Sequence, residues 1–413
     1  MIESVTSLMI GYYTLKCVSK FKQCSLYDTK SLLLSLGVYE MGLKFFTIFL
    51  VFLVPIVKVT EARADADWTH FGVRPLAMGN AYVAIADDYN ALFYNPAGIA
   101  RLKEWNGEFF NPAIAFSKNT VEASSDIVSL VSGGSNNYTA VLKLAEKNSG
   151  TNHYAGLKFT PHLVLPNFGI GLGLDNSLFG LQFSRYPSAK IDVGIRGILP
   201  ITYARNFLEN RLSIGASLKF RFKGGIDREF SIEDLAAFQS DSNTGSSDGP
   251  ALSDYVSGGY GIGADIGLLF TPIEPMEPTL GLSVTDIGGS SYEKANISGK
   301  ALGTPERQLP SVNIGLSCKP YETGTSFLRA SIDMHSINQP YSFTKKLHTG
   351  LEYSMGRIFK VQTGLHQGYL SGGLQIELPI LLSVRLATYG EEIGSSAGTI
   401  EDRRYVLQFK LLI

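Results

Sequence analysis

Strict alternation of apolar and polar residues is the strongest pattern in the chain. In residues 211–223 every even position is apolar, and every odd position is charged, Ser or Gly. The same period of two returns in residues 260–270 and 346–355. Segments of about ten residues with one apolar and one polar face are typical of strands that cross a membrane within a barrel. The pattern therefore predicts an all-β fold, a transmembrane antiparallel β-barrel.

The alternation also predicts which side chains face lipid. In residues 211–223 it places Ile214 and Leu218 against lipid, and Ser217 and Lys219 in the lumen. An arginine at position 214 or 218 should therefore destabilise the barrel, whereas an arginine at position 217 should not.

Alternating runs give fifteen candidate strands. Single-chain bacterial barrels use even numbers of strands. The first run can equally be the exit of the N-terminal segment, so we expect about fourteen strands, with twelve and sixteen as alternatives. The runs lie near residues 105–117, 153–165, 168–175, 178–185, 190–206, 210–224, 258–271, 278–286, 310–319, 326–334, 345–355, 357–365, 367–377, 380–389 and 403–413.

Residues 74–102 differ from all that follows. Small residues and an Asn-Pro step predict short helices broken at Gly79 and at Asp87 and Asp88. Asn95 can cap a helix whose first position is Pro96, where the missing N–H costs nothing. This stretch therefore predicts a compact helical plug inside a structure built from strands.

Three short motifs in this stretch resemble a known family. Their residues are Met78-Gly79-Asn80-Ala81, Ala86-Asp87-Asp88 and Asn95-Pro96-Ala97-Gly98. They are similar to the N-terminal segment of the FadL-like outer-membrane transporters of hydrophobic compounds, and most similar to their PorV-type relatives. The resemblance implies a barrel of about fourteen strands in the bacterial outer membrane, with the N-terminal segment as an internal hatch.

The chain divides into four predicted parts. Residues 1–40 show no clear pattern and form an upstream segment that translation from Met41 would omit. Residues 41–64 combine Lys44, an apolar run and the small-x-small site at 62–64, as a secretory signal peptide does. The run is shorter than the roughly 20 residues of a membrane anchor. The plug then covers 65–104 and the barrel 105–413.

Composition excludes several other classes. With 43 Gly, 11% aromatic residues and a formal charge of -1, the chain lacks the signatures of disorder and of nucleic-acid binding. Cys17 and Cys24 precede the predicted mature start, which leaves Cys318 without a disulfide partner. The six histidines show no metal-ligand spacing, and we predict neither metal nor cofactor. Beyond the signal no apolar run approaches a membrane helix, so only a closed barrel could span lipid.

Candidate chemical motifs favour structure over catalysis. The glycines in 169–173 and 259–267 occupy every second position, which fits one face of a strand, and no helix follows to bind phosphate. Asp87 and Asp88 could hold a cation or form an acid/base pair, but we expect one to cap the next turn and the other to face water or a basic lumen residue. Hydrolase signatures are missing, so we do not expect an enzyme.

Three insertions and the last strand complete the organisation. The insertions are residues 118–150, with a short helix predicted at 138–147, residues 231–257, which begin with a motif close to an N-capping box, and residues 292–309. The alternation in 405–413 resembles the C-terminal strand that the outer-membrane insertion machinery recognises. Ile413 departs from that pattern, because such strands usually end in Phe or Trp.

Two functions follow from these features. In the first, the barrel passes hydrophobic small molecules through its plugged lumen, which requires an apolar cavity and a gap in the wall. In the second, which the PorV-type resemblance implies, a non-transporting barrel is a docking component of a protein secretion or surface-assembly system.

Overall fold

We describe a computed structural model of the chain. Its described residues are 72–125, 146–183, 188–231, 234, 252–274, 276–297, 300–356, 358–378, 382–394 and 397–411. The predicted upstream segment and signal peptide lie outside these residues, as does most of the predicted helix at 138–147. Among the described residues, no helix is both long enough and apolar enough to cross a membrane.

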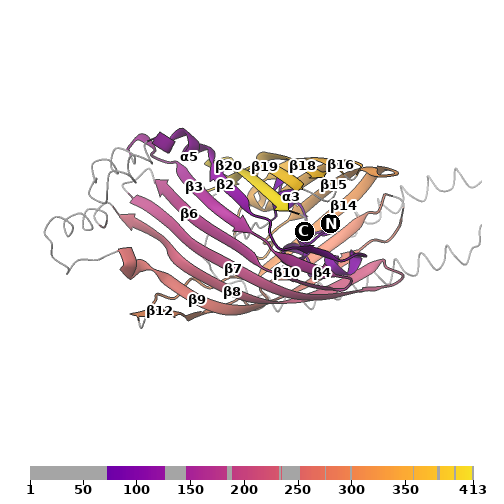
Figure 1. The fold of residues 1–413 in the computed structure, drawn as a ribbon, viewed down its shortest axis with the longest axis horizontal. Helices are drawn as coiled ribbons and strands as arrows, with labels where there is room; N and C mark the ends of the chain where they lie inside the picture. The colour runs from indigo at the N-terminus through magenta and orange to yellow at the C-terminus, as the bar shows by residue number, and fades with distance from the viewer. Residues whose placement is uncertain are drawn as a thin grey trace, which may run out of the picture. The chain divides into compact units, whose positions relative to one another are not determined.

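The strands form a closed antiparallel barrel of fourteen strands. The main sheet contains 18 strand segments, of which β1, β4, β5 and β11 extend or flank others. Neighbours pair in chain order, and β20 pairs with β2 to close the wall, where the yellow and purple strands adjoin in Figure 1. The wall strands are β2 (Ala113–Ser117), β3 (Asn152–Phe159), β6 (Gly173–Phe183), β7 (Ser188–Phe207), β8 (Leu212–Ser231), β9 (Ser257–Phe270), β10 (Thr279–Thr285), β14 (Ser311–Thr323), β15 (Ser326–Met334), β16 (Leu347–Met355), β17 (Phe359–His366), β18 (Tyr369–Leu378), β19 (Leu382–Glu392) and β20 (Glu401–Leu411).

The predicted strand number is confirmed, but one predicted boundary is wrong. The runs at 168–175 and 178–185 belong to a single wall strand, formed by β5 (Phe168–Gly171) and β6. The pairing with β7 shifts register between Ser177 and Leu181. Such a bulge interrupts the alternation of apolar and polar residues, which is why the sequence predicted two strands here. The first run supplies a wall strand, β2, preceded by β1 (Asn106–Glu108).

The predicted faces of β8 agree with the structure. Ile214 and Leu218 are 40% and 46% exposed on the outer surface, whereas Ser217 and Lys219 are buried inside. The hydroxyl of Ser217 lies 2.8 Å from that of Thr202 on β7. Because Ser217 is packed and hydrogen-bonded, it is a less suitable site for a tolerated arginine than the sequence predicted.

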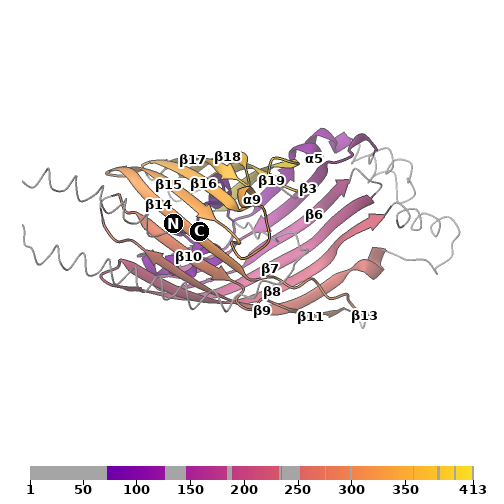
Figure 2. The ribbon, with the colours of Figure 1, turned by 180° about the vertical axis from the view of Figure 1, so that it is seen from behind.

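The turn between β7 and β8 and the longest connections lie at opposite ends of the strands. Leu208, Glu209 and Asn210 form the turn between β7 and β8 with positive φ angles of 51°, 55° and 68°. The other end carries α5 (Lys118–Glu122), η2 (Leu252–Tyr255), α9 (Phe343–Lys346) and the small strands β11 (Tyr292–Lys294), β12 (Asn296–Ile297) and β13 (Lys300–Ala301), which lie beside and beyond β9 in Figure 2.

One predicted cap is confirmed at this end. The hydroxyl of Ser231 accepts a hydrogen bond from the Asp234 N–H at 3.1 Å, and the Asp234 carboxylate accepts one from the Ser231 N–H at 2.9 Å. This reciprocal pair is the capping-box geometry, with Asp in place of the usual Glu.

Candidate functional site: the plug and its contacts with the barrel wall

From residue 72 on, where the structure describes it, the plug contains three short helical segments, α3 (Val73–Ala77), α4 (Ala91–Tyr94) and the 3₁₀ helix η1 (Pro96–Arg101). Gly79 has a φ of +62°, and the predicted break at that position is confirmed. The Asn95 side chain accepts a hydrogen bond from the Ala97 N–H at 3.2 Å, with Pro96 opening the 3₁₀ helix. The described plug residues contribute no strand to the sheet. The plug is therefore attached to the wall by packing, by side-chain contacts and by close backbone approach.

The two acids have the divided roles that the sequence predicted. The Asp88 carboxylate accepts a hydrogen bond from the Asn90 N–H at 2.8 Å and so caps the turn before α4. Asp87 instead accepts from Arg329 of β15, a basic lumen residue, at 2.5 Å. The described residues contain no group of three or more metal-binding side chains.

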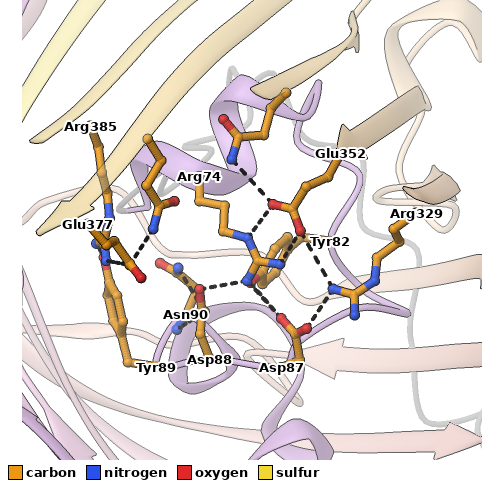
Figure 3. Close-up of polar contacts among 12 residues, drawn as sticks. Arg74, Tyr82, Asp87, Asp88, Tyr89, Asn90, Arg329, Glu352, Glu377 and Arg385 are labelled. Carbon is orange, nitrogen blue, oxygen red and sulfur yellow. Dashed lines mark hydrogen bonds and ion pairs between the residues drawn. The ribbon is translucent and has the colours of Figure 1, made fainter. Parts of the chain in front are cut away.

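Arg74 joins these acids to the wall, as Figure 3 shows. Its Nε and Nη2 donate to the two carboxylate oxygens of Glu352 on β16, both at 2.7 Å. Its Nη1 donates to Asp87 at 2.7 Å and to Asp88 at 3.0 Å. Two of these charged residues belong to the plug and two to the wall, so their ion pairs join the two parts. We call this set the ionic latch; its members are Arg74, Asp87, Arg329 and Glu352.

The latch keeps its plug carboxylate charged. Burial would raise the pKa of Asp87, but Arg329 and Arg74 outweigh that effect and hold the pKa well below its usual value. The two charged partners of Asp87 are Arg74 of the plug and Arg329 of the wall, so protonating or removing its carboxylate would leave two guanidinium groups close together. The latch therefore stabilises the seated plug through ionised groups.

A second polar group holds the plug at Tyr89, next to Asp88. The Tyr89 ring stacks on His162 of β4 (His162–Leu165) with centroids 4.0 Å apart. Its hydroxyl accepts from Arg385 of β19 at 3.1 Å, and this arginine also faces Glu108 and Glu377, at 4.0 Å and 3.5 Å. This contact is visible beside the latch in Figure 3.

Wall side chains also satisfy the plug backbone. The Nδ1–H of His348 donates to the Gly79 carbonyl at 2.8 Å, and Ser331 donates to the Ala81 carbonyl at 2.9 Å. The Val83 N–H donates to Asp333 at 2.7 Å. Buried backbone groups outside regular structure need such partners, so these contacts fix the plug in one position.

Glycines in the wall let the plug approach its backbone closely. At seven inward-facing glycines, one on each of β8, β9, β10, β14, β16, β17 and β18, a Cβ atom would lie within 3.0 Å of a plug atom, which is closer than real Cβ contacts. They include directly opposed pairs on neighbouring strands, such as Gly350 with Gly364. We call this set the glycine belt; its members are Gly215, Gly267, Gly281, Gly315, Gly350, Gly364 and Gly373.

The wall has an irregular seam beside β1. Among the described strands β1 pairs with β4 alone, whereas β2 pairs with both β3 and β20. Side chains bridge the seam: Lys410 of β20 lies 2.5 Å from Glu108, and the Asn111 amide donates to the Thr160 carbonyl at 2.7 Å. Exposed aromatic residues adjoin it, with Trp105 and Phe109 each 68% exposed. The strand ladder is thus replaced locally by side-chain contacts.

A cavity of about 610 Å³ lies between the plug and the long connections. Plug residues Val83, Phe93 and Tyr94 contribute to its lining, but most of its wall is polar or charged. The passage of hydrophobic small molecules was expected to require an apolar cavity, and this cavity is instead mainly polar. An apolar cluster instead lies between plug and wall, where Leu92 and Ile99 pack with Val164 and Leu269.

The plug motif residues occupy distinct places. Asn95, Pro96, Ala97 and Gly98 lie at the start of η1, and Met78 and Gly79 face the glycine belt. Sequence reasoning missed Arg74 and the belt. The alternation did place Glu352 and several glycines in the lumen. A carboxylate and paired glycines that face inward could have indicated contacts between wall and plug.

Comparisons with known proteins bear on the fold. No protein-family model and no curated protein matches the sequence. Among solved structures, the CymD monoaromatic hydrocarbon channel has 12% identity and a TM-score of 0.50, covering 84% of this chain and 99% of that one. The Pseudomonas putida toluene transporter TodX has 13% identity and a TM-score of 0.45, covering 84% and 99%. A Pseudomonas aeruginosa FadL homologue has 13% identity and a TM-score of 0.42, covering 82% and 98%.

The FadL-like fold that the plug motifs predicted is thus confirmed by the CymD comparison. At this identity the similarity concerns the fold. The particular closeness to PorV-type barrels stays a prediction.

Proposed function

We propose that this chain is a channel of the bacterial outer membrane that admits small hydrophobic molecules when its plug moves. The observation that carries the proposal is the way in which the plug is attached. The described plug residues contribute no strand to the closed ladder, and ion pairs, hydrogen bonds and packing hold them in place. Because the wall satisfies its own backbone, the plug can shift without opening the barrel.

Two features support a hydrophobic substrate. The apolar cluster around Leu92 and Ile99 lies between plug and wall, so a displaced plug would offer an apolar surface to a passing molecule. The seam beside β1 carries exposed aromatic side chains at a point where side chains replace strand pairing. CymD, whose fold this chain shares, is a monoaromatic hydrocarbon channel.

Uptake by cells tests the proposal. Bacteria that have an outer membrane but lack a channel of this kind would express either the full chain or a variant without residues 65–102. The measured quantity would be the initial rate of uptake of a labelled alkylbenzene at low concentration. We expect the full chain to raise uptake selectively. The deletion variant should fold as a heat-modifiable barrel, leak small polar solutes and lose that selectivity. Equal uptake with and without the full chain would contradict the proposal.

The same preparation tests three other predictions. N-terminal sequencing of envelope protein should find a mature start near Asp65, and mass spectrometry of a lipid extract should find a bound apolar compound. For the docking function, the deletion variant should leak and still bind a secretion-system protein through 118–150 and 231–257. A deletion variant that fails to fold would count against the hatch and so against both functions.

A further inference from the structure

Strands β7 and β8 are much longer than the strands on the far side of the barrel. Each contains 20 residues, whereas β16 and β17 contain nine and eight. A strand needs only about 9–11 residues to cross a membrane. Figure 1 shows β7 and β8 running on past the end of β20. We call their upper parts, together with the end of β6, the upper sheet; it comprises residues 181–183, 188–193 and 226–231.

A line of glycines crosses the wall at the base of the upper sheet. Gly194 of β7 is the Cα partner of Gly225 of β8, and Gly224 is the partner of Gly258 of β9. A Cβ at Gly194 would lie 2.5 Å from the Gly224 carbonyl oxygen, and Gly225 has a φ of +149°, so neither position suits a side chain. The pairing of β6 with β7 also shifts register beside Gly180. Glycines and bulges are the features that bend a sheet. We call this set the glycine crease; its members are Gly180, Gly194, Gly224, Gly225 and Gly258.

Two ion pairs span the crease on its lumen side. Arg196 lies 2.5 Å from Asp192 on β7, and Lys223 lies 3.2 Å from Asp227 on β8. All four side chains line the cavity. In each pair the cation lies below the crease, and the carboxylate belongs to the upper sheet. Residues four apart on a straight strand have Cα atoms about 13 Å apart, so these side chains reach along the strand over a glycine. Both pairs therefore favour a bend toward the lumen.

The restraints at the crease are weak. The four paired side chains are between 13% and 31% exposed, and partly exposed pairs contribute little and are screened by salt. Below the crease, by contrast, Lys219 and Asp265 form a pair that is 4% and 1% exposed. Packing at the crease is also incomplete, since a space of about 10 Å³, close to that of one water molecule, adjoins Gly194 and Gly225. The upper sheet is therefore held less firmly than the wall below it.

We infer that the upper sheet is a lid that hinges at the glycine crease and sets how widely the cavity opens. With the two ion pairs formed, β7 and β8 bend toward the lumen and the lid narrows the opening. When the pairs separate, the strands straighten and the lid moves outward. The change in backbone angles falls on a few residues, as in other hinges, so the strand pairing below the crease stays intact. The inference goes beyond the proposed channel function, because it concerns access to the cavity whatever molecule enters.

Distances between spin labels test the inference. Labels at Glu229 of the lid and Glu401 of β20 would report the width of the opening, and labels at Thr344 and Glu401 would avoid the lid. All three residues are exposed. Double electron–electron resonance would be recorded on the full barrel in lipid nanodiscs at about 10 mM and about 1 M NaCl, where the Debye length is about 30 Å and about 3 Å.

The labels at Glu229 and Glu401 should show two distances. We expect the longer distance to be about two- to fivefold more populated at high salt, because screening weakens two pairs of small energy. The distance between Thr344 and Glu401 should be the same at both salt concentrations.

Variants identify the contacts that hold the lid. Arg196→Gln combined with Lys223→Gln should favour the longer distance already at low salt and remove the response to salt. Lys118→Gln breaks an exposed ion pair with Glu122 at the same end of the barrel, away from the crease, and should change neither. A Cβ at Gly224 would meet only an oxygen 4.0 Å away, so Gly224→Val fits, stiffens the strand and should reduce the response to salt. Heat-modifiability would verify that each variant folds.

The results separate a lid from a fixed bend. A single distance between Glu229 and Glu401 that neither salt nor the charge variants change would overturn the lid, because the glycine crease would then only curve the sheet. An equal shift of the distance between Thr344 and Glu401 would also overturn it, since the whole barrel would then deform. Neither result would affect the channel function, which the uptake measurement tests by itself.

Discussion

Arg74 of α3 and Glu352 of β16 form a bidentate ion pair, with both N–O distances at 2.7 Å, across 278 positions of sequence. Neither side chain is exposed by more than 6%. Asp87 extends the pair to Arg329, so plug and wall charges are interleaved. The plug cannot leave its position without separating buried opposite charges, which makes this relationship the main electrostatic restraint on movement.

Breaking the latch should loosen the plug and preserve the wall. Arg74→Met or Glu352→Met leaves a buried charge without its main partner, and we expect each to destabilise the seated plug by about 3–5 kcal/mol. Planar-bilayer recordings should then show frequent openings. The double variant should be less perturbed than the sum of the single ones, because neither charge remains. Additive effects would contradict direct coupling, and Glu209→Gln provides a control without a latch contact.

Substitution in the glycine belt should also displace the plug, for a steric reason. At Gly350 a Cβ would lie 2.5 Å from the Met78 carbonyl oxygen, so Gly350→Ala should raise conductance. At Gly372 the nearest atom to such a Cβ is the Gln362 carbonyl oxygen at 3.6 Å, and Gly372→Ala should be silent. The idea fails if both alanine variants conduct alike.

The outer face of β8 should reject charge. Ile214→Arg or Leu218→Arg should destabilise the barrel by about 2–4 kcal/mol if the position lies near the membrane midplane. Gln182→Arg is the matched lumen variant, since Gln182 lines the cavity and is half-buried. Urea unfolding in lipid vesicles would compare the three. Equal stability of all three variants would indicate that the outer face of β8 does not meet lipid.

The hold of the latch on the plug should be lost only in strong acid. The pKa of Asp87 is lowered in the folded protein, and an unfolded aspartate titrates near about 3.9. The stabilisation is therefore complete above that value and declines as pH falls below it toward the folded pKa. Because protonation of Asp87 would loosen the plug, the conductance of the barrel should stay constant from pH 8 to pH 5 and rise only below about pH 4. Asp87→Asn should remove this acid response, and a response already present at pH 6 would point to another group.

Local patterns allowed much of the wall to be predicted, because each strand shows one face to lipid. The period of two placed Ile214 outside and Glu352 inside without any knowledge of strand partners. It failed at β5 and β6, since a bulge between Ser177 and Leu181 changes the phase within one strand. The Asn95 cap was also predictable, because its partners lie within two residues.

The site was harder to predict because its partners are distant in sequence. Arg74 and Glu352 come from opposite ends of the chain, and nothing near either residue indicates the other. The polar cavity was also unexpected, since it arises from the lumen faces of several strands together. The FadL resemblance implied a lumen for hydrophobic compounds and gave no information about these charges.

The glycine belt has a consequence for the size of any opening. At Gly215, Gly281, Gly350 and Gly364 the nearest plug atoms belong to its backbone, so main chain lies against main chain at these four positions. Hydrogen-bonded strands keep a spacing of about 4.7–4.9 Å, so the aperture left by a departing plug has a calibre set by backbone geometry. Rotamer changes could neither narrow nor widen the lumen at those four glycines, which carry no side chain. The size of the largest molecule that could pass there would follow from the number of strands. The transition between the shut and the open barrel would be abrupt.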